Sequence, residues 1–177
     1  MLFGRGRGRP GSAGSPTAGT GDTSAENGSS FTTHHAVIHM IRLGFVVSQF
    51  NKETPVTERM AERARETAEE HDVTLVETLR VPGSYDTPLA ADRLARRDDI
   101  DAVAVLGAIV TGDTSHDEVI GHAAAQALTD ISLDRDTPVT LGITGPGMSH
   151  DEARARVEHG ATAVESAIEL AEQLEKV

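Results

Sequence analysis

The sequence predicts an α/β fold, a single-domain three-layer α/β/α sandwich around a four-stranded parallel sheet. Four short apolar runs rich in β-branched residues alternate with four segments of helical periodicity, the pattern of consecutive βαβ units. Crossovers of this kind are right-handed and place helices on both faces of the sheet. The chain has 177 residues, a length that suits one domain with a substantial core.

The first half of the domain is marked by apolar runs and by proline-containing helix starts. LGFVVSQ at 43–49 predicts a buried strand, and Thr54-Pro55 predicts the start of a helix. That helix carries an apolar residue at every fourth position: Val56, Met60, Ala64 and Ala68. VTLVETLRV at 73–81 predicts the second strand, and Thr87-Pro88 predicts a helix that runs to Leu94.

The second half repeats the alternation. IDAVAVLGAIV at 100–110 is the most apolar run and predicts a central strand, followed by a helix from His116 to about Leu133. TPVTLGI at 137–143 predicts the fourth strand, which the Gly-Pro-Gly at 145–147 must end. Ser149 is expected to cap one long last helix with a single apolar stripe: Val157, Ala161, Val164, Ile168 and Leu174.

Composition narrows the classes of function. The net charge is −12, with 28 acidic and 16 basic residues, and only Lys52 and Lys176 are lysines. Such a surface repels a phosphate backbone, so we expect no nucleic-acid partner, and it suits solubility in high salt. The absence of cysteine excludes disulfides and thiolate sites. No apolar run approaches the ~18 residues of a membrane helix, so we expect a cytoplasmic protein.

Residues 1–39 differ from the domain predicted at 40–177. They are rich in glycine, serine and threonine and poor in apolar residues, which predicts a disordered extension. Their RGRGRP resembles the core of minor-groove AT-hooks, although a flexible tail is the simpler interpretation. MIRLGFVV, from Met40, reads as the beginning of a domain, so the native start at Met40 is an alternative.

The predicted ligand site lies at the carboxyl ends of the strands. In open parallel sheets, the loops that bind ligands gather at that edge. Each strand here is followed by a loop that is rich in polar residues, glycine or proline: residues 49–51, 81–86, 112–116 and 144–147. The sequence therefore predicts one site formed by four loops.

The turn Gly112-Asp113-Thr114 precedes a helix start, where free N–H groups and the helix dipole favour an anion. From spacing alone, an ordinary turn capped by Thr114 or Ser115 is the simpler alternative. Asp113 would repel a phosphate unless its carboxylate points away. His116 follows at the first helical turn. Histidine is the side-chain type best suited to proton transfer at neutral pH, so His116 is a candidate for proton transfer or an ordinary surface histidine.

Other residues give weaker indications of a functional role. Glu118 and His122 together with His116 resemble a zinc set, but histidines six apart lie on different helix faces, so no metal is expected. Phe50 beside Asn51 suits stacking on a heterocycle or, equally, core packing. The hydroxyl of Ser84 and the carboxylate of Asp86 suit a polyol or an ordinary turn, and an arginine of the last helix, Arg154 or Arg156, suits an anion.

Taken together, the segments resemble a known family. FN after the first strand, VPGSYDTPLA, GAIVTGDTSHDEV, and PVTLGITGPG followed by ARARVEHGATAVESAIEL resemble lumazine synthases of the archaeal type, in order and spacing, over residues 41–174. The resemblance implies a flavodoxin-like fold. It also implies the condensation of 5-amino-6-(D-ribitylamino)uracil with 3,4-dihydroxy-2-butanone 4-phosphate to 6,7-dimethyl-8-ribityllumazine. This is the penultimate step of riboflavin biosynthesis, and it uses no metal or organic cofactor.

The resemblance also implies roles by position. It assigns the pyrimidine and ribityl contacts to nine residues: Phe50, Asn51, Ser84, Tyr85, Asp86, Ala108, Ile109, Val110 and Leu141. It assigns the phosphate to Gly112, Asp113, Thr114 and Arg156, and proton transfer to His116.

The sequence departs from the family pattern at three positions and in the length of one link. Asp86 replaces a longer glutamate, Leu141 replaces a phenylalanine common in the family, and Thr111 replaces an arginine common in bacterial members. The link from Arg156 to Gly160 is short, so the register of Arg156 is open by a few residues. The phosphate role is therefore open among three residues: Arg154, Arg156 and His159.

The resemblance implies a homo-oligomer with small-molecule substrates. The family forms pentameric rings with sites at subunit interfaces, where Leu141 would be contributed by a neighbour. The short link before Gly160 favours the family's 60-subunit shell over a free pentamer. The alternatives are an archaeal-type riboflavin synthase, a non-catalytic flavodoxin-like module that binds flavin or phosphate, and a non-enzymatic shell protein. The FN and G-x-T-x-H segments favour lumazine synthase.

Overall fold

The computed structural model describes residues 40–49 and 56–177, which contain a four-stranded sheet with all strands parallel. The strand order is β2-β1-β3-β4. The strands are β1 (Arg42–Ser48), β2 (Thr74–Val81), β3 (Ala102–Ala108) and β4 (Val139–Thr144). The predicted fold class is confirmed. The predicted start of the first helix, at Thr54-Pro55, lies outside the described residues.

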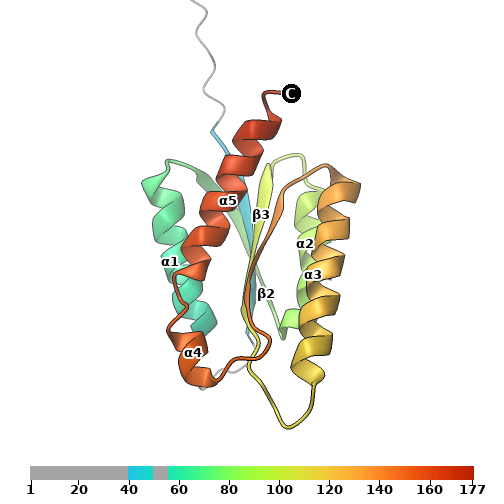
Figure 1. Cartoon of the computed structure of the whole chain (residues 1–177). Coiled ribbons are helices and arrows are strands. Elements are labelled where there is room, and N and C mark those ends of the chain that lie inside the picture. Colours follow the sequence, from blue (N-terminus) through green and yellow to red (C-terminus); the bar gives the residue numbers. More distant parts are fainter. Residues whose placement is uncertain (1–39, 50–55) are drawn as a thin grey trace, which may run out of the picture. The chain divides into compact units, whose positions relative to one another are not determined.

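Helices cover both faces of this sheet (Figure 1). On one face lie α1 (Val56–Glu70) and α5 (His159–Leu174), and on the other lie α2 (Thr87–Ala95) and α3 (His116–Arg135). The short helix α4 (His150–Arg154) and the loop that precedes α3 lie at the lower end of the sheet in this view. That end is the one at which the parallel strands finish.

The core follows from the burial of the two central strands. Every residue of β3 is buried, as is every residue of β1 after Arg42, because each strand has a neighbour on both sides and a helix layer on both faces. Phe45 and Leu106 point toward α1 and α5, whereas Val46 and Val105 point toward α2 and α3. Truncating such a side chain to alanine typically costs about 2–5 kcal/mol.

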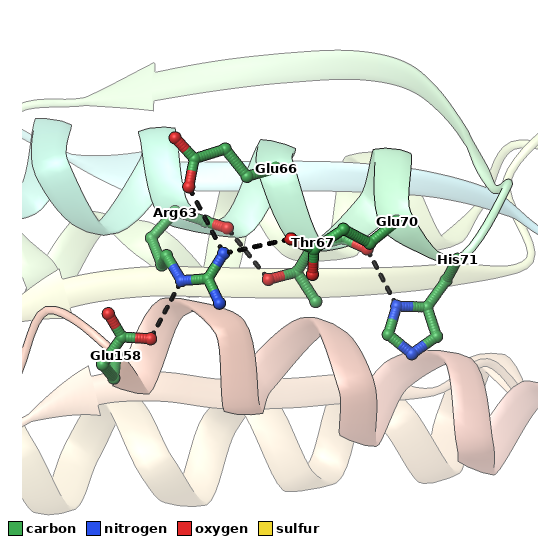
Figure 2. Close-up of polar contacts among 6 residues, drawn as sticks. All are labelled: Arg63, Glu66, Thr67, Glu70, His71 and Glu158. Atoms are coloured by element: carbon green, nitrogen blue, oxygen red, sulfur yellow. Dashed lines mark hydrogen bonds and ion pairs between the residues drawn. The ribbon is translucent and has the colours of Figure 1, made fainter.

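The α1 and α5 helices are joined by close packing and by an ion pair (Figure 2). A Cβ on Gly160 would lie 2.3 Å from the carbonyl oxygen of Met60, so only glycine permits this approach of the two helices. Arg63 donates from Nε to Glu158 at 2.9 Å, and its Nη1 lies 3.3 Å from a carboxylate oxygen of Glu66 on its own helix. These contacts place the start of α5 on α1.

The expectation of one long last helix from Ser149 is wrong. Ser149 does cap a helix, with the reciprocal bonds to Glu152 of a capping box, but α4 ends at Arg154 and α5 begins at His159. Hydrogen bonds of shorter span join the turn between them, from His159 N to Arg156 O at 3.1 Å and from Gly160 N to Val157 O at 3.0 Å. The turn lets Gly160 pack closely against Met60 of α1.

The third strand is shorter than its apolar run suggests. β3 ends at Ala108, and Ile109 and Val110 follow it outside the strand. Its neighbour β4 ends at Thr144, where Gly145 takes a positive φ of 93° and turns the chain. The apolar residues after Ala108 therefore belong to the loop at the carboxyl edge.

Candidate active site

A cleft of about 510 Å³ lies at the carboxyl edge of the sheet. Two of its walls come from the loops that follow β2 and β3, and α4 adds one residue. The residues that line it are Gly83, Ser84, Tyr85, Ala108, Ile109, Val110, Thr111, Gly112, Thr114, His116, Asp117, Ile120 and His150. Of the four loops predicted to form the site, those after β2 and β3 meet in this cleft. Residues 144–147, after β4, do not line it, and residues 50–51 lie outside the described residues.

The loop after β2 forms a compact turn beside the cleft. Residues Ser84–Asp86 make a short 3-10 helix, and the Thr87 hydroxyl donates to the Ser84 carbonyl at 2.7 Å. Ser84 is buried and its hydroxyl donates to that of Ser48 at 3.3 Å, whereas Tyr85 is 65% exposed. Asp86 is exposed but does not line the cleft, and one of its carboxylate oxygens accepts the N–H of Gly83 at 2.9 Å.

The end of β3 and the segment that follows it line the cleft. Ile109 donates its N–H to the Thr144 carbonyl at 2.8 Å, and Thr111 donates to the Met148 carbonyl at 2.8 Å, so backbone pairing continues past both strand ends. A Cβ on Gly145 would lie 2.2 Å from the Ile109 carbonyl oxygen, which makes glycine necessary there. The backbone of residues 108–110 is thus held at a defined position.

The turn from Gly112 to Ser115 is exposed and open. A Cβ on Gly112 would meet no other atom within 4 Å, and Gly112 and Thr114 line the cleft while Asp113 does not. Ser115 is at the N-cap position of α3, yet its side chain makes no capping hydrogen bond. This arrangement leaves backbone donors of the loop accessible to an anion in the cleft.

Two histidines line the cleft. His116 is the first residue of α3 and is exposed. His150 is the first residue of α4 and was not singled out in the sequence. The capping box that starts at Ser149 was a usable signal, because it starts a helix just past the end of β4, at the edge where the ligand loops gather.

Asp117 was also missed as a site residue. It is 7% exposed, and its Oδ2 accepts the Thr111 hydroxyl and the Gly147 N–H, each at 3.2 Å. The pKa of the Asp117 carboxyl is lowered, mainly by the Gly147 N–H and also by the Thr111 hydroxyl, against the opposing effect of burial. A carboxylate in the first helical turn is usually a solvated residue, so its sequence position alone did not predict burial.

Several predicted residues do not meet in this cleft. Leu141 is 53% exposed on the edge strand β4, and Arg156 is exposed in the turn between α4 and α5; neither lines the cleft. Arg154 pairs with Asp151, and His159 begins α5. Phe50 and Asn51 lie outside the described residues.

Within residues 40–49 and 56–177, no group of three histidine or acidic side chains is arranged to hold a metal ion. In the same residues, no helix is long and apolar enough to cross a membrane.

A family model described as 6,7-dimethyl-8-ribityllumazine synthase matches residues 40–175. The chain belongs to this family. It is 65% identical over 135 residues to the 6,7-dimethyl-8-ribityllumazine synthase of Halobacterium salinarum, covering 76% of this chain and 100% of that one. The synthase of Halorubrum lacusprofundi is 62% identical over 136 residues, 77% of this chain and 100% of its own. The synthase of Methanocaldococcus jannaschii is 42% identical over 138 residues, which cover 78% of this chain and 96% of that one.

Family membership decides between the classes considered for the sequence. The chain is an enzyme, a transferase of riboflavin biosynthesis. A riboflavin synthase and a non-catalytic flavodoxin-like module are not favoured, because the matching family and these three relatives carry the lumazine synthase name.

Proposed function

We propose that the cleft at the carboxyl edge condenses 5-amino-6-(D-ribitylamino)uracil with 3,4-dihydroxy-2-butanone 4-phosphate to 6,7-dimethyl-8-ribityllumazine. The observation that carries this proposal is the convergence of His116 with the open Gly112–Thr114 turn in one cleft, beside Ser84 and Tyr85. A proton carrier and free backbone donors lie next to each other there, as a reaction that expels phosphate requires.

The pyrimidine and its ribityl chain occupy the part of the cleft between the loops after β2 and β3. The backbone of Ala108–Val110, held by its pairing to Thr144, meets the edge of the pyrimidine ring. Ser84 and Tyr85, which line the cleft, contact the ribityl hydroxyls. Asp86 lies next to them but outside the lining, and we propose that it reaches the chain through carboxylate capacity beyond the Gly83 N–H that it already accepts. Phe50 stacks on the ring with Asn51 beside it.

The phosphate of the four-carbon substrate binds at the start of α3. The backbone of Gly112, Asp113 and Thr114 donates to it, and the positive end of the helix dipole favours its charge. Asp113 does not line the cleft, so we assign only its backbone N–H, and not its side chain, to the phosphate.

The chemistry needs little beyond proximity and proton transfer. The ketone carbon and an amine of the pyrimidine form an imine with loss of water, the phosphate leaves, and the second amine closes the ring with loss of a second water. Holding both substrates in register supplies much of the rate, because the reaction becomes effectively unimolecular. His116 moves protons between the nitrogen and oxygen atoms of these steps, and no metal or organic cofactor takes part.

Completion of the site requires a neighbouring subunit. Leu141 and Arg156 do not line the cleft of their own chain, and Leu141 is a half-exposed apolar residue on an edge strand. An apolar residue on a sheet edge favours a contact with another chain. We place Leu141 over the pyrimidine and Arg156 on the phosphate of the adjacent subunit in a pentameric ring. Rings close through such heterologous interfaces.

We also propose that the rings assemble into the 60-subunit shell, because the link from Arg156 to Gly160 is short and Gly160 is held against Met60. The net charge of −12 suits an acidic cytoplasmic protein that stays soluble at high salt.

The direct test is incubation of the purified protein with both substrates while the absorbance and fluorescence of the lumazine product are recorded. Appearance of product only when both substrates are present supports the proposal. A protein that instead consumes lumazine to make riboflavin, or that makes no product from the two substrates, contradicts it.

The shared site is tested by mixing inactive variants. Rings refolded from a mixture of His116→Ala and Arg156→Ala chains contain some interfaces that pair one intact cleft with one intact arginine. These mixed rings should recover part of the activity that each variant lacks alone. Absence of recovery in rings shown by mass measurement to contain both chains contradicts a shared site.

A further inference from the structure

Asp117 stands apart from the other acidic residues of the described chain. Among residues 40–49 and 56–177, it is the only charged residue that is buried, whereas its neighbour Glu118 in the same helical turn is exposed. A carboxylate is buried at a cost of several kcal/mol unless hydrogen-bond donors replace its water. Its partners are therefore informative.

The Asp117 carboxylate joins three separate segments. From the first turn of α3, its Oδ2 accepts the hydroxyl of Thr111, which lies at the start of the cleft loop, and the N–H of Gly147, which lies in the turn after β4. Thr111 is linked to the turn after β4 a second time, through its N–H and the Met148 carbonyl at 2.8 Å. The carboxylate is the point at which these segments are tied together.

The surrounding packing keeps the turn after β4 in reach of Asp117. Gly147 has a positive φ of 80°, a conformation that glycine adopts without strain. A Cβ on Gly121 would lie 2.9 Å from the Pro146 side chain, so α3 passes directly against this turn. The Gly147 N–H is thus held where the first turn of α3 begins.

These bonds fix both ends of a short functional loop. The segment from Gly112 to His116 contains the open backbone donors and the histidine. All five of its residues are exposed, and a Cβ on Gly112 would meet no other atom within 4 Å. It starts next to Thr111 and ends next to Asp117, and these two residues are bonded to each other. Without that bond, the loop would be anchored at its start only by the Thr111 backbone.

Two simpler roles for Asp117, an interaction with the helix dipole and general-base catalysis, do not account for its burial and its hydrogen bonds. Any acidic residue in a first helical turn interacts with the dipole, but exposed Glu118 does so without being buried. A general base needs an ordinary or raised pKa, whereas the pKa of the Asp117 carboxyl is lowered, first by the hydrogen bond from the Gly147 N–H.

We propose that Asp117 is a positioning residue, which ties Thr111 and Gly147 to the first turn of α3 and so holds the Gly112–His116 loop in the conformation that binds phosphate. This inference rests on the proposed function of that loop. Because Asp117 acts through the loop, its removal should weaken binding of the butanone phosphate selectively. Binding of the pyrimidine substrate should be nearly unaffected.

The experiment compares Asp117→Ala, Asp117→Asn and Thr111→Val with the wild type. KM is measured for each substrate separately, and inorganic phosphate is titrated as an inhibitor. We expect Asp117→Ala to raise the KM of the butanone phosphate and the inhibition constant of phosphate about tenfold or more, with the KM of the pyrimidine changed less than twofold. Asp117→Asn should recover most of the loss, since its amide oxygen can accept both donors.

Thr111→Val removes one hydroxyl from an exposed residue, so it tests the tie even if Asp117→Ala does not fold. We expect Thr111→Val to raise the KM of the butanone phosphate and the inhibition constant of phosphate by a few-fold. Glu118→Gln, in the same turn, is the matched control and should change neither.

Equal changes in both KM values, or an unchanged phosphate constant in Thr111→Val and Asp117→Ala, would overturn the proposal. Failure of the wild type to make lumazine would overturn the proposed function instead. In that case, phosphate binding by the same variants, measured by calorimetry, still decides whether Asp117 positions the loop.

Discussion

The amino end of the sheet and the Gly112–His116 loop at its carboxyl end are held in different ways. At the amino end, charged side chains pair directly: Arg42 makes two side-chain bonds to Asp101, at 3.0 and 2.6 Å, and its N–H adds a third at 2.7 Å. At the carboxyl end, Arg80 pairs with Glu58 and Arg154 with Asp151, but the loop from Gly112 to His116 is exposed. The residues on either side of that loop are joined through the buried carboxylate of Asp117.

This difference suggests that the two regions contribute differently to stability and to ligand binding. Side chains that pair with each other have little capacity left for a ligand, so the amino end contributes to stability. Loops that leave backbone donors unpaired contribute less to stability but present those donors to a substrate. Variants at the two ends should therefore have different phenotypes, and the predictions on His116, Asp92 and Arg42 test that separation.

The largest expected effect is at the carboxyl end. His116→Ala should lower turnover by up to about 10²-fold, because the proton carrier is lost while substrate proximity is kept. KM values and the melting temperature should change little. The matched control is His122→Ala, an exposed histidine on the same helix that does not line the cleft, which should keep wild-type turnover. A wild-type turnover number for His116→Ala would contradict the proton-transfer role.

The next effect is on stability, near the amino end. Asp92 accepts hydrogen bonds from Arg96 and Arg135, each at 2.8 Å, and so joins α2 to α3. Asp92→Asn should lower the free energy of unfolding by about 1 kcal/mol at pH 7, with kcat unchanged. Urea unfolding followed by circular dichroism measures the free energy of unfolding, and the lumazine assay measures kcat.

The same variant has a defined pH dependence. The bond from Arg96, followed by that from Arg135, holds the pKa of Asp92 below its ordinary value of 3.8. The contribution of the charged carboxylate is therefore complete above about pH 5 and is lost as the pH falls below 3.8 toward the lower folded-state value. The difference in stability between wild type and Asp92→Asn should shrink between pH 5 and pH 3. A constant difference would mean that the ion pairs are not its source.

A smaller effect is expected for Arg42→Lys. Lysine keeps the charge but cannot reproduce the two-pronged guanidinium contact with Asp101. The melting temperature should fall by about 2–4 °C, with both KM values unchanged. Arg93→Lys, on an exposed surface of α2, is the comparison and should leave the melting temperature unchanged. A change in KM for Arg42→Lys would break the separation between the two ends.

The smallest effect concerns residues outside the described domain. Deleting residues 1–39 should leave turnover and the melting temperature unchanged within error, since their composition cannot form a core and the family match begins at residue 40. A clear loss of either, measured beside the full chain, would show that the extension contributes to the fold or to the assembly.

Local patterns were sufficient for the order of elements and for the edge at which the cleft lies. The apolar run at 100–110 predicted a central buried strand, and β3 is buried throughout. The Gly-Pro-Gly after Thr144 predicted the end of the last strand, and β4 ends there. Such features depend on periodicity and on backbone preferences that act over a few residues, and these are visible in a single sequence.

The sequence by itself determined the alternation of strands and helices, the parallel sheet, and the gathering of residues 108–116 with Ser84 and Tyr85 at one edge. Only the tertiary structure decided that Asp117 is buried between Thr111 and Gly147, and that His150 enters the cleft. It also decided that the last helix breaks where Gly160 meets Met60. The physical reason is that periodicity records which face of an element is apolar, whereas burial of one carboxylate or contact of one glycine depends on segments far apart in the chain.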